Sequence, residues 1–302
     1  MILYLNSGEQ IRGDLIKSAI IRTDMSPVPV TLEAEIRTDE DMAKKLAEGE
    51  MITAGGSSVS SGDTLRIIKS TLVENRIVQG NREMDAIQIT AMLDACHGIA
   101  FVRNRAIIKE NAVLSAIYRA SGATIKAVDA DFPVPRFYCP VGDTPSFHIA
   151  RALQEEGGIV RWKDGRLKFF RLSDLFKQDP IMELPENASD YINSGFLERH
   201  EIPWFYSLDD AGGFVLGDQR KPRSVRYAPF MNAQRLRNMS RCLVQRKISN
   251  INLSAGIAAG DLINFTGRDP LVVITAAHVF QSGTDGSGSN QYTRLWLGSL
   301  EG

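Results

Sequence analysis

The sequence predicts a β-rich α+β fold in which a small α/β unit lies between a β-rich start and a β-rich end. Three observations carry this prediction. Apolar and polar residues alternate in segments before residue 92, the main helix signals lie between about 90 and 157, and strand-like segments fill the chain from 224 onward. The 302 residues are 43% apolar and 24% charged, which allows two or three domains with a buried core.

The first region, residues 1–92, is predicted to consist of strands with one helix. In its clearest strand Val30, Leu32, Ala34 and Ile36 alternate with Thr31, Glu33, Glu35 and Arg37, which places charge on one face only. Segment 39–49 predicts a short amphipathic helix that Asp39 caps and Gly49 ends. The Gly/Ser run 55–62 predicts a flexible loop, and strands resume over 64–73 and 85–90.

The middle region is predicted to be a small α/β unit with three helices, over 90–97, 111–120 and 144–157. The third is the clearest, because Thr144 is a good N-cap and Pro145 suits a first turn. Phe147, Ala150 and Leu153 would form its apolar stripe. Asp164-Gly165 then lies between two strand-like runs, which is a strong signal for a tight β-hairpin.

The last region contains a second predicted hairpin over 204–218 and strand-like segments from 224 to 300. Its longest strand is apolar on both faces: Val272, Ile274, Ala276, His278 and Phe280 face one way, and Val273, Thr275, Ala277 and Val279 face the other. A strand of this kind is predicted to be buried on both sides. Several short strands at this spacing favour a closed barrel, which leaves no sheet edge.

Charge is segregated along the chain although the net charge is only −1. That balance excludes a globally basic nucleic-acid binder and a polyacidic disordered chain. Residues 183–218 hold eight acids and one strong base, whereas 220–247 hold nine bases and no acid. The basic stretch 220–247 is either a solvated strand face or a patch for an acidic partner, protein or nucleic acid. If the partner is a single-stranded nucleic acid, Tyr227 and Phe230 would stack on its bases.

The titratable residues predict no enzyme, no cofactor and no metal site. The three cysteines lie far apart, the four histidines are scattered, and neither a CxxC pair nor an HExxH motif occurs. Cys96 and His97 are adjacent, and successive side chains on a helix do not face each other. His278 is interpreted as a packed strand histidine, and Asp209-Asp210 as turn formers.

No apolar run is long enough to span a membrane, and the first residues lack the pattern of a secretory signal. The sparse, odd set of cysteines fits a reducing compartment.

The most specific pattern lies in residues 254–302. Gly260-Asp261 precedes a strand, the next strand ends in Ala277-His278-Val279, and a glycine-rich loop over 282–290 leads to Tyr292-Thr293-Arg294-Leu295-Trp296-Leu297. This order resembles the second barrel of phage tail baseplate hub proteins, a group that includes the late control protein D family and the hub part of type VI secretion spike proteins. Segment 140–169, a short helix followed by a Trp162…Asp164-Gly165 hairpin, looks like the insertion domain of those hubs.

The resemblance implies two tube-like β-barrel domains with an inserted α/β domain. The first barrel would take residues 1–92, the inserted domain and its connection 93–194, and the second barrel 195–302. Hubs of this family are similar to trimeric rings, in which six barrels from three chains adapt a sixfold tail tube to a threefold central spike and let the genome pass. The polar face of the 30–37 strand would line the inner rim. No spike-forming β-helix and no lysozyme-like region is recognised, so we expect the spike to be a separate chain.

The expected partners are two further copies of the chain, a tail tube protein, a central spike protein, and other baseplate proteins including the tape measure. DNA would pass transiently through the lumen. The protein would reside in the tail baseplate of the virion after assembly in the host cytoplasm. Two alternatives stay open: a nucleic-acid-binding barrel protein that uses the basic stretch 220–247, and a hydrolase that uses Cys96 or His278. The interface candidates are Arg220, Lys221, Arg223, Arg226, Arg235, Arg237, Thr284, Asp285, Ser287 and Asn290.

Overall fold

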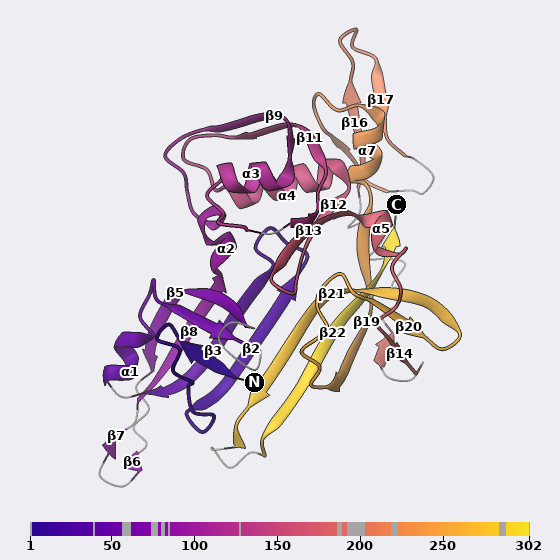
Figure 1. Ribbon diagram of the computed structural model, residues 1–302. Helices are drawn as coiled ribbons and strands as arrows, with labels where there is room; N and C mark the ends of the chain where they lie inside the picture. The colour runs from indigo at the N-terminus through magenta and orange to yellow at the C-terminus, as the bar shows by residue number, and fades with distance from the viewer. Residues whose placement is uncertain are drawn as a thin grey trace.

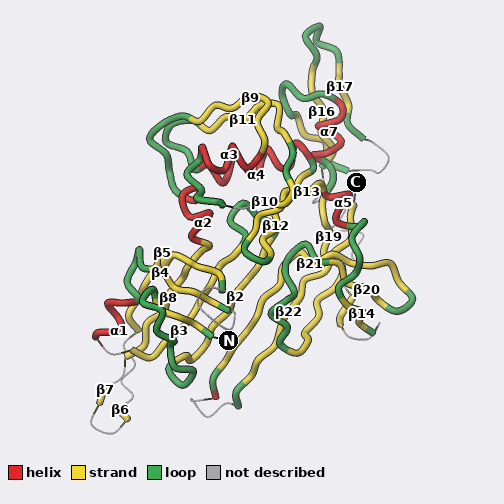
Figure 2. Tube along the Cα trace, viewed as in Figure 1, coloured by secondary structure: helices red, strands yellow, loops and turns green. Residues whose placement is uncertain are grey.

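The computed structural model describes residues 2–38, 40–55, 62–73, 78–79, 82–83, 85–126, 128–185, 189–191, 203–218, 223–283 and 288–301. The two β-rich ends of the chain lie side by side in the lower half of Figure 1, and the helices of the middle region gather above them. Figure 2 shows the same division, with most strands below and most helices above. The predicted order of β-rich, α/β and β-rich regions is therefore present.

Both ends of the chain contribute to one sheet of twelve strands. From the first region come β1 (Leu3–Leu5), β2 (Ile16–Asp24), β3 (Val30–Thr38), β4 (Met51–Ala54), β5 (Asp63–Val73) and β8 (Asp85–Leu93). From later in the chain come β14 (Met182–Leu184), β15 (Ser189–Tyr191), β19 (Cys242–Asn252), β20 (Leu262–Phe265), β21 (Arg268–Gln281) and β22 (Asn290–Glu301). The strand order is β1-β4-β5-β8-β3-β2-β21-β22-β19-β15, with β20 on β21 and β14 on β20. A short ribbon joins β6 (Val78–Gln79) to β7 (Arg82–Glu83).

The antiparallel ladder between β2 and β21 joins the two halves of this sheet, from Ser18 opposite Gln281 to Asp24 opposite Thr275. Its partners are far apart in the chain, so local sequence patterns could not predict the ladder. It makes the two β-rich regions one continuous structure. The closure of each region into a barrel, and the domain limits at 92 and 194, stay predictions.

The strand predicted over 30–37 is β3, and its two faces differ as expected. Val30, Leu32, Ala34 and Ile36 are buried. On the other face Glu33 pairs with Arg22 at 2.9 Å and Glu35 pairs with Lys17 at 2.6 Å, both across to β2. The predicted helix is α1 (Glu40–Lys45), which ends earlier than Gly49. Its predicted cap, Asp39, and most of the Gly/Ser run lie outside the described residues.

The middle region contains α2 (Asp94–His97), a 3-10 turn (Gly98–Ala100), β9 (Ile107–Val113), α3 (Leu114–Ala120), β10 (Val128–Ala130), β11 (Pro133–Cys139), α4 (Pro145–Glu156), β12 (Gly158–Lys163), β13 (Arg166–Arg171) and α5 (Leu172–Leu175). β9 pairs with β11, and β10, β13 and β12 form a second small sheet. The hairpin predicted from Asp164-Gly165 is confirmed as β12–β13. Asp164 and Gly165 have φ angles of 53° and 72°, as a type I′ turn requires.

Two of the predicted helices begin later than expected, because their first residues are held in ladders. Residues 90–93 belong to β8, where Thr31 of β3 pairs with Met92, so only Asp94–His97 is helical. Residues 111–113 belong to β9, where Val113 pairs with Pro133, so the second helix is Leu114–Ala120. In both places the hydrogen bonds of a neighbouring strand override local helix propensity.

Helix α4 has the predicted ends, but its predicted stripe is wrong at two of its three residues. Phe147 is 71% exposed, and Ala150 is also exposed, whereas Ile149, Ala152 and Leu153 are buried. The buried stripe instead runs from Pro145 through Ile149 and Leu153, because α4 packs against β11 and β12 with that face.

The predicted hairpin over 204–218 is confirmed as β16 (Trp204–Leu208) and β17 (Phe214–Leu216), which β18 (Val225–Tyr227) extends to three strands in the order β17-β16-β18. The expectation of strands throughout 224–300 is wrong at α7 (Ala233–Met239). Asn232 caps this helix, because its side-chain oxygen accepts the N–H of Arg235 at 2.9 Å.

Strand β21 is buried on both faces as predicted, but its side chains do not keep one alternation throughout. The register against β22 shifts between Val273 and Thr275, so Ile274 is an extra residue in the ladder. A bulge of this kind reverses which face later residues occupy. Ala276 therefore shares a cluster with Leu271 and Val273, whereas Val272 packs in another with Leu175 and Leu262.

Candidate functional site

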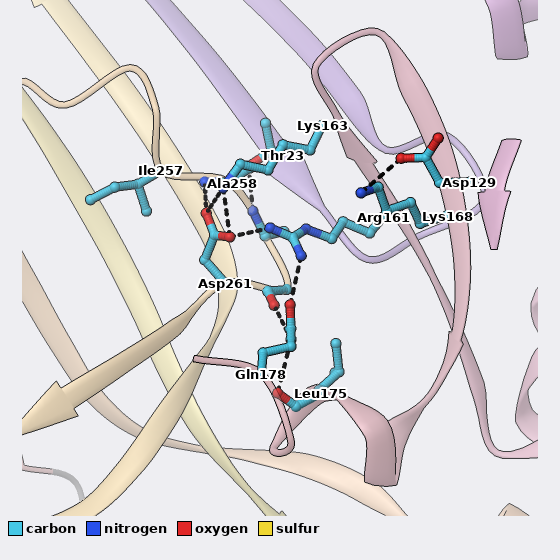
Figure 3. Close-up of polar contacts among 12 residues, drawn as sticks. Thr23, Asp129, Arg161, Lys163, Lys168, Leu175, Gln178, Ile257, Ala258 and Asp261 are labelled. Atoms are coloured by element: carbon cyan, nitrogen blue, oxygen red, sulfur yellow. Dashed lines mark hydrogen bonds and ion pairs between the residues drawn. The ribbon is translucent and has the colours of Figure 1, made fainter. Parts of the chain in front are cut away.

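Several residues that carried the sequence resemblance lie at one polar junction, and Figure 3 shows its part around Asp261. Its centre is Asp261, which is 1% exposed and follows the turn residue Gly260, whose φ is 86°. The Asp261 carboxylate accepts bonds from Arg161, from Lys163 Nζ at 2.8 and 3.0 Å, and from the Ala258 N–H at 2.8 Å. A buried carboxylate is tolerated only when it is paired and hydrogen-bonded in this way.

The β12–β13 hairpin supplies both cations of the junction. Arg161 and Lys163 are two residues apart on β12, so they share a face and reach the same carboxylate. The Arg161 guanidinium also donates to Gln178 Oε1 at 2.8 Å, and Gln178 in turn donates to the Gly260 carbonyl at 3.1 Å. The hairpin is thereby fixed to the C-terminal β-rich region.

Trp162 lies between those cations and points toward the N-terminal region instead. Its indole Nε1–H donates to Asp63 Oδ1 at 2.7 Å. Burial raises the pKa of Asp63 above its ordinary value, and the bond from Trp162 offsets part of this effect. One hairpin therefore ties both β-rich regions together. Thr23 of β2 adds a further link, because its hydroxyl accepts the Ala259 N–H at 2.9 Å.

His278 belongs to the same junction and has both ring nitrogens occupied. Nε2 lies 3.1 Å from the Ile257 carbonyl, to which it donates, so Nδ1 accepts from the Thr293 hydroxyl at 3.0 Å. Thr293 accepts the Ser254 N–H at 2.9 Å in turn. This series of hydrogen bonds holds the imidazole in one neutral tautomer. The interpretation of His278 as a packed, hydrogen-bonded strand histidine therefore matches its surroundings.

We expect His278 to make stability depend on pH. Burial lowers the pKa of His278 below 6.5 in the folded chain, so protonation favours the unfolded chain. The contribution of the neutral imidazole is complete above about pH 6.5 and is lost as the pH falls through the folded pKa. His278→Gln, which cannot titrate, should cost about 1 kcal/mol at pH 8. Urea unfolding at pH 8 and pH 5 should show the gap between the two proteins narrowing at the lower pH. The same difference in the free energy of unfolding at both pH values would show that titration of His278 does not cause the pH dependence.

A cavity of about 500 Å³ lies at the junction, lined among others by Asp63, Trp162, Lys163 and His278. Every one of these polar side chains already bonds another residue of the chain. Among the described residues, no group of three or more His, Cys, Asp or Glu side chains is arranged to hold a metal ion. The geometry is that of a joint between segments.

The other catalytic candidates are placed as follows. Cys96 is fully buried, and burial raises the pKa of its thiol to about 12, far from a reactive thiolate. The neighbouring His97 ring lies against Phe101, with 4.7 Å between ring centroids. Asp209 forms a turn as predicted, because its Oδ1 accepts the N–H groups of Ala211 and Gly213 at 3.0 and 2.7 Å. His148 lies 2.9 Å from Asp143, and His200 lies outside the described residues.

Much of the basic stretch 220–247 is directed inward. The Arg223 guanidinium lies 4.4 Å from the centre of the Trp204 ring, and its side chain is 4% exposed. Arg246 pairs with Glu301 at 2.7 Å, and the buried Lys247 lies 4.4 Å over the Phe265 ring. These side chains contact other residues of the chain and do not form a basic patch on the surface.

Arg235 explains a pair of acids at the end of α4, where carboxylates oppose the helix dipole. Its guanidinium lies 3.0 Å from Glu156 and 3.6 Å from Glu155, both of which are buried. This cluster joins α7 to α4. Two acids at the C-terminus of a helix indicate that a cation lies nearby, so the sequence contained a signal. Nothing in the sequence identified that cation as Arg235.

The remaining interface candidates divide into two groups. Arg226, Arg237 and Asn290 have exposed side chains. Arg220, Lys221, Thr284, Asp285 and Ser287 lie outside the described residues. Among the described residues, no helix is long and apolar enough to cross a membrane.

Comparison with solved structures identifies proteins that share this fold along nearly the whole chain. The tail protein from Neisseria meningitidis MC58 is 12% identical, with a TM-score of 0.66 over 99% of this chain and 95% of that one. The 43 kDa tail protein of prophage MuSo2 from Shewanella oneidensis is 13% identical, with a TM-score of 0.64 over 99% and 97%.

A third similar structure is an Escherichia coli component of the type VI secretion system, described as similar to the T4 phage tail proteins gp27 and gp5. It is 8% identical, with a TM-score of 0.55 over 93% of this chain and 73% of that one. No family model and no curated protein matches the sequence. The predicted resemblance is confirmed at the level of the fold.

Proposed function

We propose that this chain is a structural protein of a phage tail and forms the hub of its baseplate. The observation that carries the proposal is the similarity in fold to two phage tail proteins over 99% of the chain. The β2–β21 ladder supports it, because it fastens two β-rich regions side by side in every copy. The domains would be a first barrel over 1–92, an insertion over 93–194 and a second barrel over 195–302.

Three copies would place six β-rich regions around one axis. Such a ring offers an approximately sixfold surface to a tail tube protein and a threefold surface to a central spike protein, which resolves the symmetry mismatch. The charged face of β2 and β3, with its Glu33–Arg22 and Glu35–Lys17 pairs, is proposed to line the lumen. A polar lumen would let the DNA pass without binding it. The tape measure and other baseplate proteins would be neighbours in the virion.

The surfaces that meet the tube and the spike are proposed to include Arg226, Arg237 and Asn290, whose side chains are exposed. The role is proposed to be structural and not enzymatic. Nucleic-acid binding through the basic stretch is the weaker proposal, because Arg223, Arg235, Arg246 and Lys247 contact other residues of the chain.

The test is the mass of the purified chain in solution by light scattering, with negative-stain images of the same peak. From a protomer of 33.4 kDa we expect a species of about 100 kDa and rings with a central hole. Oligonucleotide binding measured across a salt series is the control, and we expect little at physiological salt. Tight, salt-dependent binding by a monomer would favour the nucleic-acid alternative. Disruption of the gene in its phage, which should leave particles without functional tails, tests the role independently of self-assembly.

A further inference from the structure

The three-stranded sheet β17-β16-β18 has one face that is apolar throughout. Residues directly opposite in a ladder share a face, and the register pairs Tyr206 with both Leu216 and Tyr227. The side chains on this face are those of Trp204, Tyr206, Leu208, Phe214, Leu216, Val225 and Tyr227. Trp204 is buried beneath the Arg223 guanidinium at one end of the face, and the other six side chains form the apolar sheet face. Tyr206 lies at its centre, with ring centroids 5.7 Å from Phe214 and 5.3 Å from Tyr227.

The opposite face of this small sheet is already covered. Ser207 is fully buried there, and its hydroxyl accepts the Met231 N–H at 3.2 Å, just before α7. The helix then packs against β16 and β17. A sheet with one covered face ordinarily exposes polar residues on the other. Here the uncovered face carries the larger apolar side chains, which the fold of the single chain leaves unexplained.

The exposed area of this face matches what a protein interface needs. Phe214 is 72% exposed, Val225 55% and Tyr227 51%, and Leu208 and Leu216 are each above 40%. With ordinary side-chain areas this is about 500 Å² of apolar surface. A standard interface buries about 800 Å² per partner, of which somewhat more than half is apolar. The apolar sheet face is therefore large enough to be the centre of a stable contact.

A second exposed apolar surface lies near the start of α4. The Gly142 N–H donates to the Arg103 carbonyl at 2.9 Å, and the Arg103 N–H donates to the Asp143 carbonyl at 3.1 Å, so two loops run side by side. Their exposed residues, with one from the first turn of α4, form the apolar loop surface: Val102, Val141 and Phe147, exposed by 64%, 63% and 71%.

The two surfaces lie at opposite ends of α4. The apolar loop surface is at its N-terminal end, whereas its C-terminal end contacts α7 through Arg235 and through Gln154, which donates to the Met239 carbonyl. A helix of 12 residues separates its ends by about 18 Å. In Figure 1 the hairpin of β16 and β17 projects from the upper part of the molecule beyond α7.

We propose that the apolar sheet face of one copy of this chain docks on the apolar loop surface of the next copy. Two different surfaces at opposite ends of a molecule make a head-to-tail contact, which closes into a ring when the rotation permits, whereas one self-complementary surface makes only a pair. The inference rests on the proposed ring of three and names the contact that forms it. The partner is a second copy because the chain itself carries both halves of the contact.

The experiment uses two double variants of the full chain. Phe214→Asp with Val225→Asp places charge on the apolar sheet face, and Val102→Asp with Val141→Asp places it on the apolar loop surface. Leu72→Asp is the matched control, because Leu72 is an apolar strand residue that is 53% exposed elsewhere. We expect the wild type and the control to form the species of three chains by light scattering. Each double variant should lose it, with a dissociation constant raised at least about 100-fold.

Mixing the two double variants is the decisive step. Each retains the surface that the other lacks, so an equimolar mixture should form one species of two chains although each variant alone is a monomer. This result also shows that both variants are folded. No pairing on mixing, rings that survive both double substitutions, or a wild type that is monomeric at every concentration would each overturn the docking proposal. Surviving rings would leave the hub function standing. An open polymer that the substitutions dissolve would support the docking contact and contradict the closed hub.

Discussion

Asp261→Ala is expected to lower the free energy of unfolding by about 3–5 kcal/mol, which is the usual result of removing one partner from a buried ion pair. The substitution leaves Arg161, whose side chain is 7% exposed, and Lys163 without their shared carboxylate. It also removes the acceptor of the Ala258 N–H, so the turn before β20 loses its internal support. Urea unfolding followed by circular dichroism measures the change.

Two further variants make the Asp261 experiment specific. Asp261→Asn keeps an oxygen for the Ala258 N–H but removes the charge, so we expect an intermediate loss. Asp269→Ala is the matched control, because Asp269 is an exposed acid on β21, and its substitution should change stability by no more than about 0.5 kcal/mol. Equal effects of Asp261→Ala and Asp269→Ala would show that the junction contributes nothing.

Tyr118→Ala should destabilise the chain by about 3–5 kcal/mol, the cost of emptying the space of a large core aromatic. Tyr118 lies on α3 and is fully buried, and its ring centroid is 5.1 Å from that of Phe169 on β13. Its hydroxyl donates to the Pro27 carbonyl at 3.1 Å, in the turn between β2 and β3. This side chain therefore packs the middle region onto the first β-rich region.

Tyr118→Phe separates the two contributions of this residue. It keeps the ring and removes only the hydrogen bond, so we expect a loss of about 1 kcal/mol. Tyr138→Ala is the control, since Tyr138 is 50% exposed on β11 and should change stability by about 0.5 kcal/mol or less. Thermal unfolding of the three variants gives the comparison. If the Tyr118→Ala protein were as stable as the Tyr138→Ala protein, Tyr118 would not contribute to packing the middle region onto the first β-rich region.

Local signals in the sequence were sufficient for several elements. Asp164-Gly165 predicted the β12–β13 turn because few residues adopt two successive positive φ angles at low cost. The alternation from Val30 to Arg37 predicted both faces of β3, since side chains of a strand point to opposite faces in turn. Thr144 and Pro145 marked the start of α4, and Gly157, with a φ of 61°, marked its end.

Other features depended on partners that the sequence does not identify. Helix α7 was missed because it is only seven residues long and lies among strand-like segments. Arg235 holds it against Glu155 and Glu156. The bulge at Ile274 exists only relative to β22, so a strict alternation along β21 was the wrong expectation. The positive charge of the basic stretch was evident from the sequence. The acidic and aromatic side chains that contact its bases belong to residues 155–156, 204, 265 and 301, which the sequence does not identify.

The candidate junction also depends on contacts that the sequence does not identify. Gly260-Asp261, Trp162 and His278 were each recognisable as motif residues, and no pattern indicated that they meet. The contacts of Asp261 and Trp162 link residues about 100 positions apart, Arg161 with Asp261 and Trp162 with Asp63. Such contacts form only when the long segments between them have already been packed, which local periodicity does not encode.

By itself the sequence determined the β-rich α+β class, the order of its regions and the hairpin that turns at Asp164-Gly165, because these follow from the period and turn chemistry of neighbouring residues. The tertiary structure alone decided that β2 pairs with β21, that Asp261 receives Arg161 and Lys163, and that one face of β16–β18 is left uncovered. Each of these is a relation between distant segments. The free energy that selects it comes from burial and pairing across the whole fold, and no short stretch of residues contains that information.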